Sequence, residues 1–126
     1  MKKLALLLVA VSLFVATPVM AMTWDGNKIL KYCKESQKIL DNEKDLSINY
    51  HYATYCKNFI AATIEIHRDL ADYFDKGNCF CLPKDGFQIG QAIRIVVRYL
   101  ETNLDKLHYQ GSTLSLIALN EAFPCE

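Results

Sequence analysis

The sequence predicts an all-α fold, a small disulfide-stapled helical bundle of four to six helices. Apolar residues recur at spacings of three and four rather than two over most of the chain, which is the period of amphipathic helices. Prolines are rare, with only Pro83 and Pro124 beyond residue 21. Five cysteines follow an N-terminal segment with the pattern of an export signal, and small exported domains commonly carry disulfides.

The N-terminal segment, residues 1–21, predicts a cleavable secretory signal peptide. Lys2 and Lys3 precede an apolar run, and Val19-Met20-Ala21 places a small residue at the expected cleavage position. A membrane anchor is the alternative, but a span needs about 20 apolar residues and Pro18 shortens this run. We therefore expect cleavage after residue 21.

The mature chain, residues 22–126, is long enough for one helical domain and not two. Lys2 and Lys3 are lost with the signal, so the 14 Lys and Arg residues of the chain fall to 12 against 14 Asp and Glu, a net charge of −2. This weak acidity, without a run of five like charges, argues against a nucleic-acid partner. After cleavage we also expect no attachment to a membrane.

The first half of the mature chain predicts two helices. The first covers residues 25–40 and is capped by Asp25 or Thr23. The second begins after Ser47, a plausible N-cap, and its apolar stripe continues for about 28 residues, which is long for a globular helix. An unbroken helix and a break near His67 both remain open.

The second half predicts a loop and two further helices. The loop covers residues 77–86, where two glycines enclose polar residues. A third helix follows over residues 87–102, and then a short turn at 103–111. Ser112 is expected to cap the fourth helix, which Pro124 ends.

The cysteines are placed where they can staple this bundle. Cys33 and Cys56 lie on the apolar faces of consecutive helices, so an antiparallel hairpin would bring them together. A bond from Cys81 to Cys125 would fix the C-terminus to the body, with Cys79 as the rival of Cys81, because the count alone does not fix the connectivity. Loops of about 24 and 45 residues correspond to about 3–4 kcal/mol of stabilisation each.

No motif in the sequence specifies catalysis or a cofactor. There is no Gly-x-Ser-x-Gly and no glycine-rich phosphate loop, and His51, His67 and His108 are scattered. The spacing at Cys79-Phe80-Cys81 is not the Cys-x-x-Cys of zinc and thiol-redox sites. We expect a protein that is not an enzyme, with no catalytic residue, no metal and no cofactor.

Several short motifs, in their order and spacing, resemble one known family. They are Cys-Lys-Asn-Phe-Ile at 56–60, Phe-Cys-Leu-Pro at 80–83, Gln91, Val-Val-Arg-Tyr-Leu at 96–100 and Ala-Leu-Asn-Glu-Ala-Phe-Pro-Cys at 118–125. This pattern is similar to the Rap/Tai family of periplasmic immunity proteins against type VI secretion amidases. Asn58, Leu104 and the additional Cys79 depart from the family pattern and leave the amidase subtype open.

The resemblance implies an inhibitor in the periplasm that binds a cognate peptidoglycan amidase effector and commonly forms a homodimer. In the family a loop between helices enters the amidase cleft, and here the corresponding loop is residues 77–86. The partner contacts expected in and beside this loop are Phe80 as an apolar anchor and Lys76, Asn78, Lys84 and Asp85 around it. The alternative is an ordinary connector that packs Phe80 inward.

Two other functions are alternatives to immunity. A small periplasmic acid-stress chaperone would also be helical and disulfide-linked, and the three histidines and 14 acidic residues do not exclude it. A small secreted hydrolase is disfavoured because no nucleophile and base stand in a recognisable arrangement.

Overall fold

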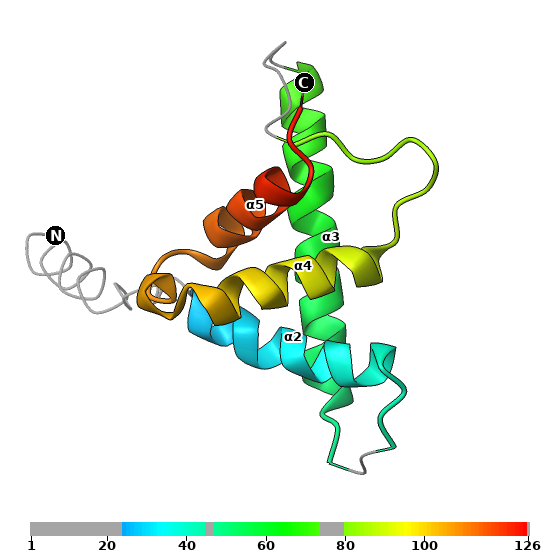
Figure 1. Cartoon of the computed structure of the whole chain (residues 1–126), viewed down its shortest axis with the longest axis vertical. Coiled ribbons are helices and arrows are strands. Elements are labelled where there is room, and N and C mark those ends of the chain that lie inside the picture. The colour runs from blue at the N-terminus through cyan, green and yellow to red at the C-terminus, as the bar shows by residue number, and fades with distance from the viewer. Residues whose placement is uncertain (1–23, 45–46, 74–79, 126) are drawn as a thin grey trace, which may run out of the picture.

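The computed structural model describes residues 24–44, 47–73 and 80–125. These residues form the helices α2 (Gly26–Leu40), α3 (Tyr50–Tyr73), α4 (Ile89–Thr102) and α5 (Gly111–Ala122), with the 3₁₀ turn η1 (Leu104–Lys106) between α4 and α5. α3 is the longest of the described helices, α2 and α4 lie side by side in opposite directions, and α5 packs against α3 and α4 (Figure 1). No strand occurs in the described ranges, so the all-α expectation is confirmed.

Helix α2 begins and ends with defined caps. The Asp25 carboxylate accepts a hydrogen bond from the Lys28 backbone N–H at 2.9 Å, as the sequence predicts for an N-cap. At the other end Asn42 adopts φ 55°, in the left-handed region that ends many helices. The Asn42 and Glu43 N–H groups then donate to the carbonyls of residues 39 and 38.

Helix α3 is a single helix of 24 residues that continues past His67, so no break occurs there. The expected cap at Ser47 is wrong. Asn49 caps the helix instead, since its side chain accepts from the Tyr52 N–H at 3.1 Å. The Glu35 carboxylate of α2 accepts from the Asn49 N–H at 2.8 Å, so a residue from another helix fixes this start.

Helix α4 presents the most regular apolar stripe of the molecule. Its buried residues are Ala92, Ile93, Val96, Val97, Tyr99 and Leu100. The helix starts at Ile89, two residues later than expected, and Gln88 before it is extended with no side-chain cap. Phe87 remains outside the helix, where its ring meets the Phe123 ring edge-on at 5.6 Å.

Helix α5 begins at Gly111, so the expected cap at Ser112 is also wrong. Gly111 is needed at this point because two backbones approach closely. Its N–H donates to the Trp24 carbonyl at 2.6 Å, and a Cβ at residue 111 would stand 2.4 Å from Cγ1 of Ile29. The Ser115 hydroxyl, which is buried, donates to the Gly111 carbonyl at 2.7 Å.

The four helices share one core. Its fully buried large side chains are Ile29, Ile60, Ile93, Val96, Val97, Leu100, Leu114 and Leu119, together with Cys33, Cys56 and Ser115. Ser115 has its hydrogen-bond partner, and among the described residues no buried side-chain polar atom lacks one. Buried polar atoms with hydrogen-bond partners are what a well-packed small domain requires.

The expected signal peptide lies outside the described residues, because the description starts at residue 24. Cleavage after residue 21 therefore stays a prediction. Within the described ranges no helix combines the length and the apolar content that a membrane crossing needs.

Candidate functional site

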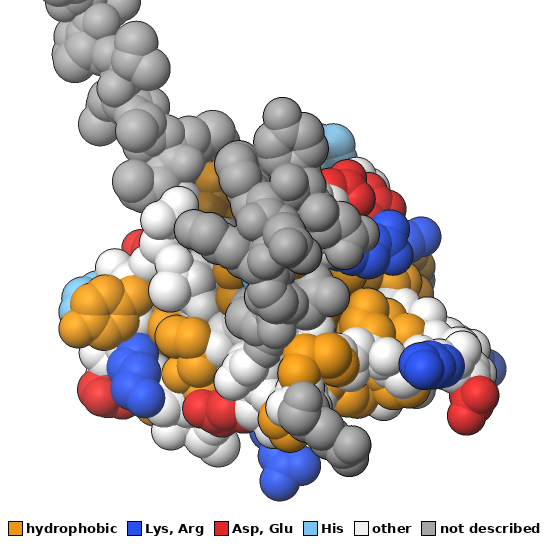
Figure 2. All heavy atoms as spheres, turned by 90° about the horizontal axis from the view of Figure 1, so that it is seen from above, with side chains coloured by type: hydrophobic (Ala, Val, Ile, Leu, Met, Phe, Trp, Pro, Cys, Tyr) orange, Lys and Arg blue, Asp and Glu red, His pale blue; other side chains and the backbone are white. Residues whose placement is uncertain are grey.

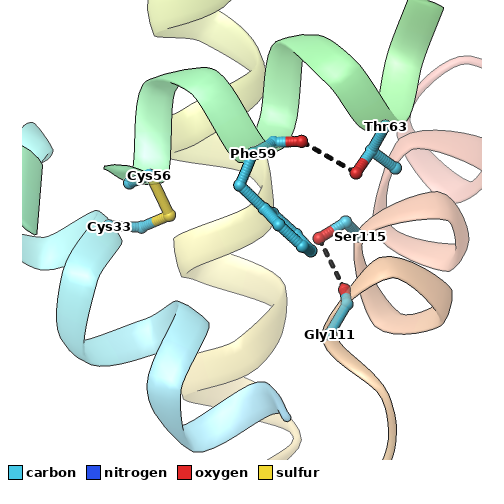
Figure 3. The surroundings of a disulfide bond; sticks show 6 residues. All are labelled: Cys33, Cys56, Phe59, Thr63, Gly111 and Ser115. Carbon is cyan, nitrogen blue, oxygen red and sulfur yellow. Dashed lines mark hydrogen bonds between the residues drawn. A yellow bond between two sulfur atoms is a disulfide. The ribbon is translucent and has the colours of Figure 1, made fainter. Parts of the chain in front are cut away.

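The bond between Cys33 and Cys56 is a buried staple. It joins α2 to α3 with a Cα–Cα distance of 5.0 Å, and both residues are 0% exposed. Figure 3 shows it bridging the two helices, with the Phe59 side chain pointing from α3 toward the start of α5. This is the pairing that the two apolar helix faces predict.

The bond between Cys81 and Cys125 lies at the surface. The Cα–Cα distance is 5.0 Å, and both cysteines are exposed. The Cys81 N–H also donates to the Phe123 carbonyl at 2.8 Å, so the loop is tied to the segment after α5 at two points. The structure thus forms the favoured pair, and Cys79 lies outside the described residues.

Phe80 faces the core in this structure rather than the solvent. Its side chain is only 5% exposed, and its ring stacks on the His67 ring of α3 with centroids 5.0 Å apart. Of the two roles that the sequence left open, the structure therefore has the inward one. Phe80 directly precedes Cys81, and the bond from Cys81 to Cys125 keeps this part of the loop close to the body.

The exposed part of the loop is its turn. Lys84 and Asp85 are exposed, and Gly86 follows with φ 104°, a conformation that other residues rarely adopt. A Cβ on Gly86 would meet nothing within 4 Å, so the backbone angle and not crowding calls for glycine. Lys76 and Asn78, the other two expected contacts, lie outside the described residues.

A pocket of about 300 Å³ lies between α3 and this loop. Apolar residues, Ile64, Phe80 and Leu82, line part of it together with Cys81. The rest of the lining is basic or imidazole, from His67, Arg68 and Lys84. No pattern in the sequence predicts this pocket, because Arg68 and Lys84 are far apart in the chain.

A second, more apolar groove of about 480 Å³ lies between α3 and α5. Ile66 and Leu70 on α3 are 59% and 51% exposed, and His67 lines this groove as well as the first pocket. Where side chains are visible in Figure 2, apolar ones alternate with charged ones on this end of the molecule.

An aromatic cluster links the start of α2 to α3. Trp24 stacks on Phe59 at 5.3 Å, and Tyr32 stacks on Tyr52 at 4.2 Å. The Lys28 ammonium lies 4.8 Å from the Trp24 ring, within the range of a cation–π contact. These side chains are partly buried, so the cluster mainly extends the core to the surface.

The described residues contain no group of three or more His, Cys, Asp or Glu side chains that could hold a metal ion. The two pockets offer apolar surface, and the one beside the loop adds positive charge.

Comparison with known proteins gives one result. No curated protein and no solved structure matches the chain. A family model, described as Rap1a immunity proteins, matches residues 25–125. This range contains all four helices and both disulfides, and it confirms the resemblance noted from the sequence motifs. The chain belongs to the family of Rap1a immunity proteins.

Proposed function

We propose that the protein is a periplasmic immunity protein that binds a type VI secretion amidase effector and occludes the cleft where that enzyme cleaves peptidoglycan. The family match over residues 25–125 carries this proposal. The inhibitor contributes no chemistry of its own. It acts by filling the cleft, so its affinity depends on a few central contacts.

The loop before α4 is well suited to enter a cleft. It extends away from the body between α3 and α4 (Figure 1). Residues 80 and 81 of this loop are attached to the body by the buried Phe80 side chain, by the Cys81–Cys125 bond and by the hydrogen bond from the Cys81 N–H to the Phe123 carbonyl. A loop held in this way loses little conformational freedom on binding, which favours affinity. Lys84 and Asp85 at its turn are the side chains that would meet the partner first.

A periplasmic location is proposed from two features. Disulfides form and persist in oxidising compartments, and two of them hold this fold together. Residues 1–21 have the pattern of a signal peptide.

We also propose a homodimer. Large apolar side chains, among them Leu104 and Ile117, are 65% and 39% exposed, and a second copy would remove them from water. Light scattering of the mature protein should give twice the mass of one chain. A monomer at the concentrations used for inhibition would refute the dimer without affecting the inhibition itself.

The function is tested with the purified mature protein and a panel of peptidoglycan amidases of the cysteine–histidine type. We expect one amidase to bind with sub-micromolar affinity and to stop releasing peptides from cell-wall sacculi at stoichiometric inhibitor. An amidase that is bound but stays active would contradict occlusion of the cleft. If the protein instead suppresses aggregation of other proteins at low pH and binds no amidase, it is an acid-stress chaperone.

A further inference from the structure

The pocket between α3 and the loop has the composition of a site for a negatively charged group. Its lining includes Arg68 and His67 of α3 and Lys84 of the loop, and none of the described residues that line it is acidic. Among the described side chains, the acidic residues nearest in sequence, Glu65, Asp69 and Asp85, are not part of the lining. In the part of the chain that the structure describes, neither Arg68 nor Lys84 forms an ion pair.

Some other cations of the described residues have acidic partners. Lys34 pairs with Glu101 at 3.0 Å, and Arg94 pairs with Asp41. Arg68 and Lys84 differ from these, because their two positive charges come from separate elements and open onto one cavity. None of the described residues that line this cavity supplies a negative charge.

The pocket floor strengthens the preference for an anion. The buried Phe80 ring and the side chains of Ile64 and Leu82 make it apolar. Charges that meet over such a surface are less screened than charges in open water. The planar Arg68 guanidinium can donate two parallel hydrogen bonds to a carboxylate, while the Lys84 ammonium adds a single positive charge.

We propose that this cationic pocket binds a carboxylate on the surface of the amidase effector, from an aspartate or glutamate side chain. The inference rests on the proposed function, because Lys84 lies at the loop turn that would enter the cleft. When the turn is inserted, the effector surface beside the cleft covers the pocket. An acidic residue there pairs with Arg68 and Lys84, and this pairing fixes the orientation of the complex.

The test measures affinity for the amidase that the wild-type protein inhibits, at low and at high ionic strength. Arg68→Glu and Lys84→Glu should each weaken binding about tenfold or more at low ionic strength, with a smaller loss at high salt because salt screens the repulsion. Lys44→Glu is the matched control, since it makes the same charge change on the exposed α2–α3 connection at the other end of α3 (Figure 1). It should change affinity by no more than about twofold.

A second arm locates the carboxylate. Acidic residues beside the amidase cleft are replaced by lysine one at a time, and one of these variants should bind Arg68→Glu better than it binds the wild-type inhibitor. Arg68→Gln and Lys84→Gln repeat the measurement if the reversed charges disturb folding, which circular dichroism reports.

The outcomes separate the two claims. If the wild-type protein inhibits no amidase, the proposed function fails and this inference fails with it. If it inhibits one but the charge variants bind as the wild type does, the pocket proposal alone is overturned. If the wild-type protein binds an anionic muropeptide and the charge variants do not, while their affinity for the amidase is unchanged, the pocket binds a cell-wall fragment. That result would also overturn the proposal.

Discussion

At the scale of single residues, positions that look alike in the sequence differ sharply in the structure. Gly90 and Gly111 both lie at the start of a helix, yet their surroundings differ. A Cβ at Gly111 would meet Ile29 at 2.4 Å and the Trp24 carbonyl at 2.6 Å, whereas at Gly90 it would meet the end of the Leu40 side chain at 3.0 Å. Backbone cannot move aside as easily as the tip of a flexible side chain.

This difference predicts opposite effects of alanine. Gly111→Ala should lower the free energy of unfolding by about 1–3 kcal/mol, because the added methyl forces α5 away from the start of α2. Gly90→Ala should leave it unchanged or raise it by up to about 1 kcal/mol, because alanine favours the helix and Leu40 can shift. Urea titrations of both variants measure the two values, and equal losses would contradict the close approach at Gly111.

Phe80 provides a second prediction at this scale. Phe80→Ala should cost about 3–5 kcal/mol of stability, since it removes a buried ring that stacks on His67. Tyr50→Ala removes an aromatic side chain that is 67% exposed and should change stability by less than about 0.5 kcal/mol. Equal melting temperatures for the two variants would show that Phe80 is not part of the core in solution.

At the scale of elements, the two disulfides join different kinds of segment. Cys33–Cys56 links two helices inside the core, whereas Cys81–Cys125 links a loop to the chain end at the surface. Thiol–disulfide exchange requires a thiolate to reach a sulfur atom, so accessibility controls the rate under native conditions.

We therefore predict stepwise reduction. After any free thiol has been blocked, a mild thiol reductant should open Cys81–Cys125 first, and the folded protein should gain a mass of about 2 Da, for two hydrogens. Cys33–Cys56 should open only when the protein unfolds. Intact mass and peptide mapping of alkylated samples follow both steps, and simultaneous loss of the two bonds in native buffer would contradict the burial of the first.

Removal of each bond by alanine substitution separates its contribution. The chain-entropy model assigns about 3–4 kcal/mol to each, because loops of about 24 and 45 residues differ little in closure entropy. In the double Cys33→Ala, Cys56→Ala variant the core also loses packed sulfur atoms. The free energy of unfolding should therefore fall by more in this variant than in the double Cys81→Ala, Cys125→Ala variant.

At the scale of the whole molecule, the proposed inhibitor consists of a packed helical body and a short exposed turn. The body is one core shared by four helices, and the turn at Lys84 and Asp85 is held beside it through Cys81. Binding energy concentrated in such a turn is lost when a few side chains are changed, without loss of the fold.

Replacement of Lys84 and Asp85 by alanine should therefore weaken amidase inhibition about tenfold or more and leave the melting temperature unchanged. Glu43 and Lys44 form a matched control, because they are an adjacent exposed pair of the same charges on the α2–α3 connection. Their double alanine variant should inhibit as the wild type does. Equal inhibition by both variants would remove the turn from the proposed interface.

Much of this protein is determined by the sequence alone. The spacing of apolar residues specifies helices and their buried faces, and it puts Cys33 and Cys56 on two faces that meet. The motifs near Cys81 and Cys125 identify the family, which the family match confirms. These features are readable because they depend on local periodicity and on the order of short motifs.

Only the tertiary structure decided which residues from separate segments meet. In the structure, Asn49 rather than Ser47 caps α3, and Phe80 faces inward and stacks on His67. It also brought Arg68 of α3 and Lys84 of the loop to one pocket. Local sequence patterns do not predict such contacts. The contacts form only when the helices pack against one another, and that packing depends on residues throughout the folded chain.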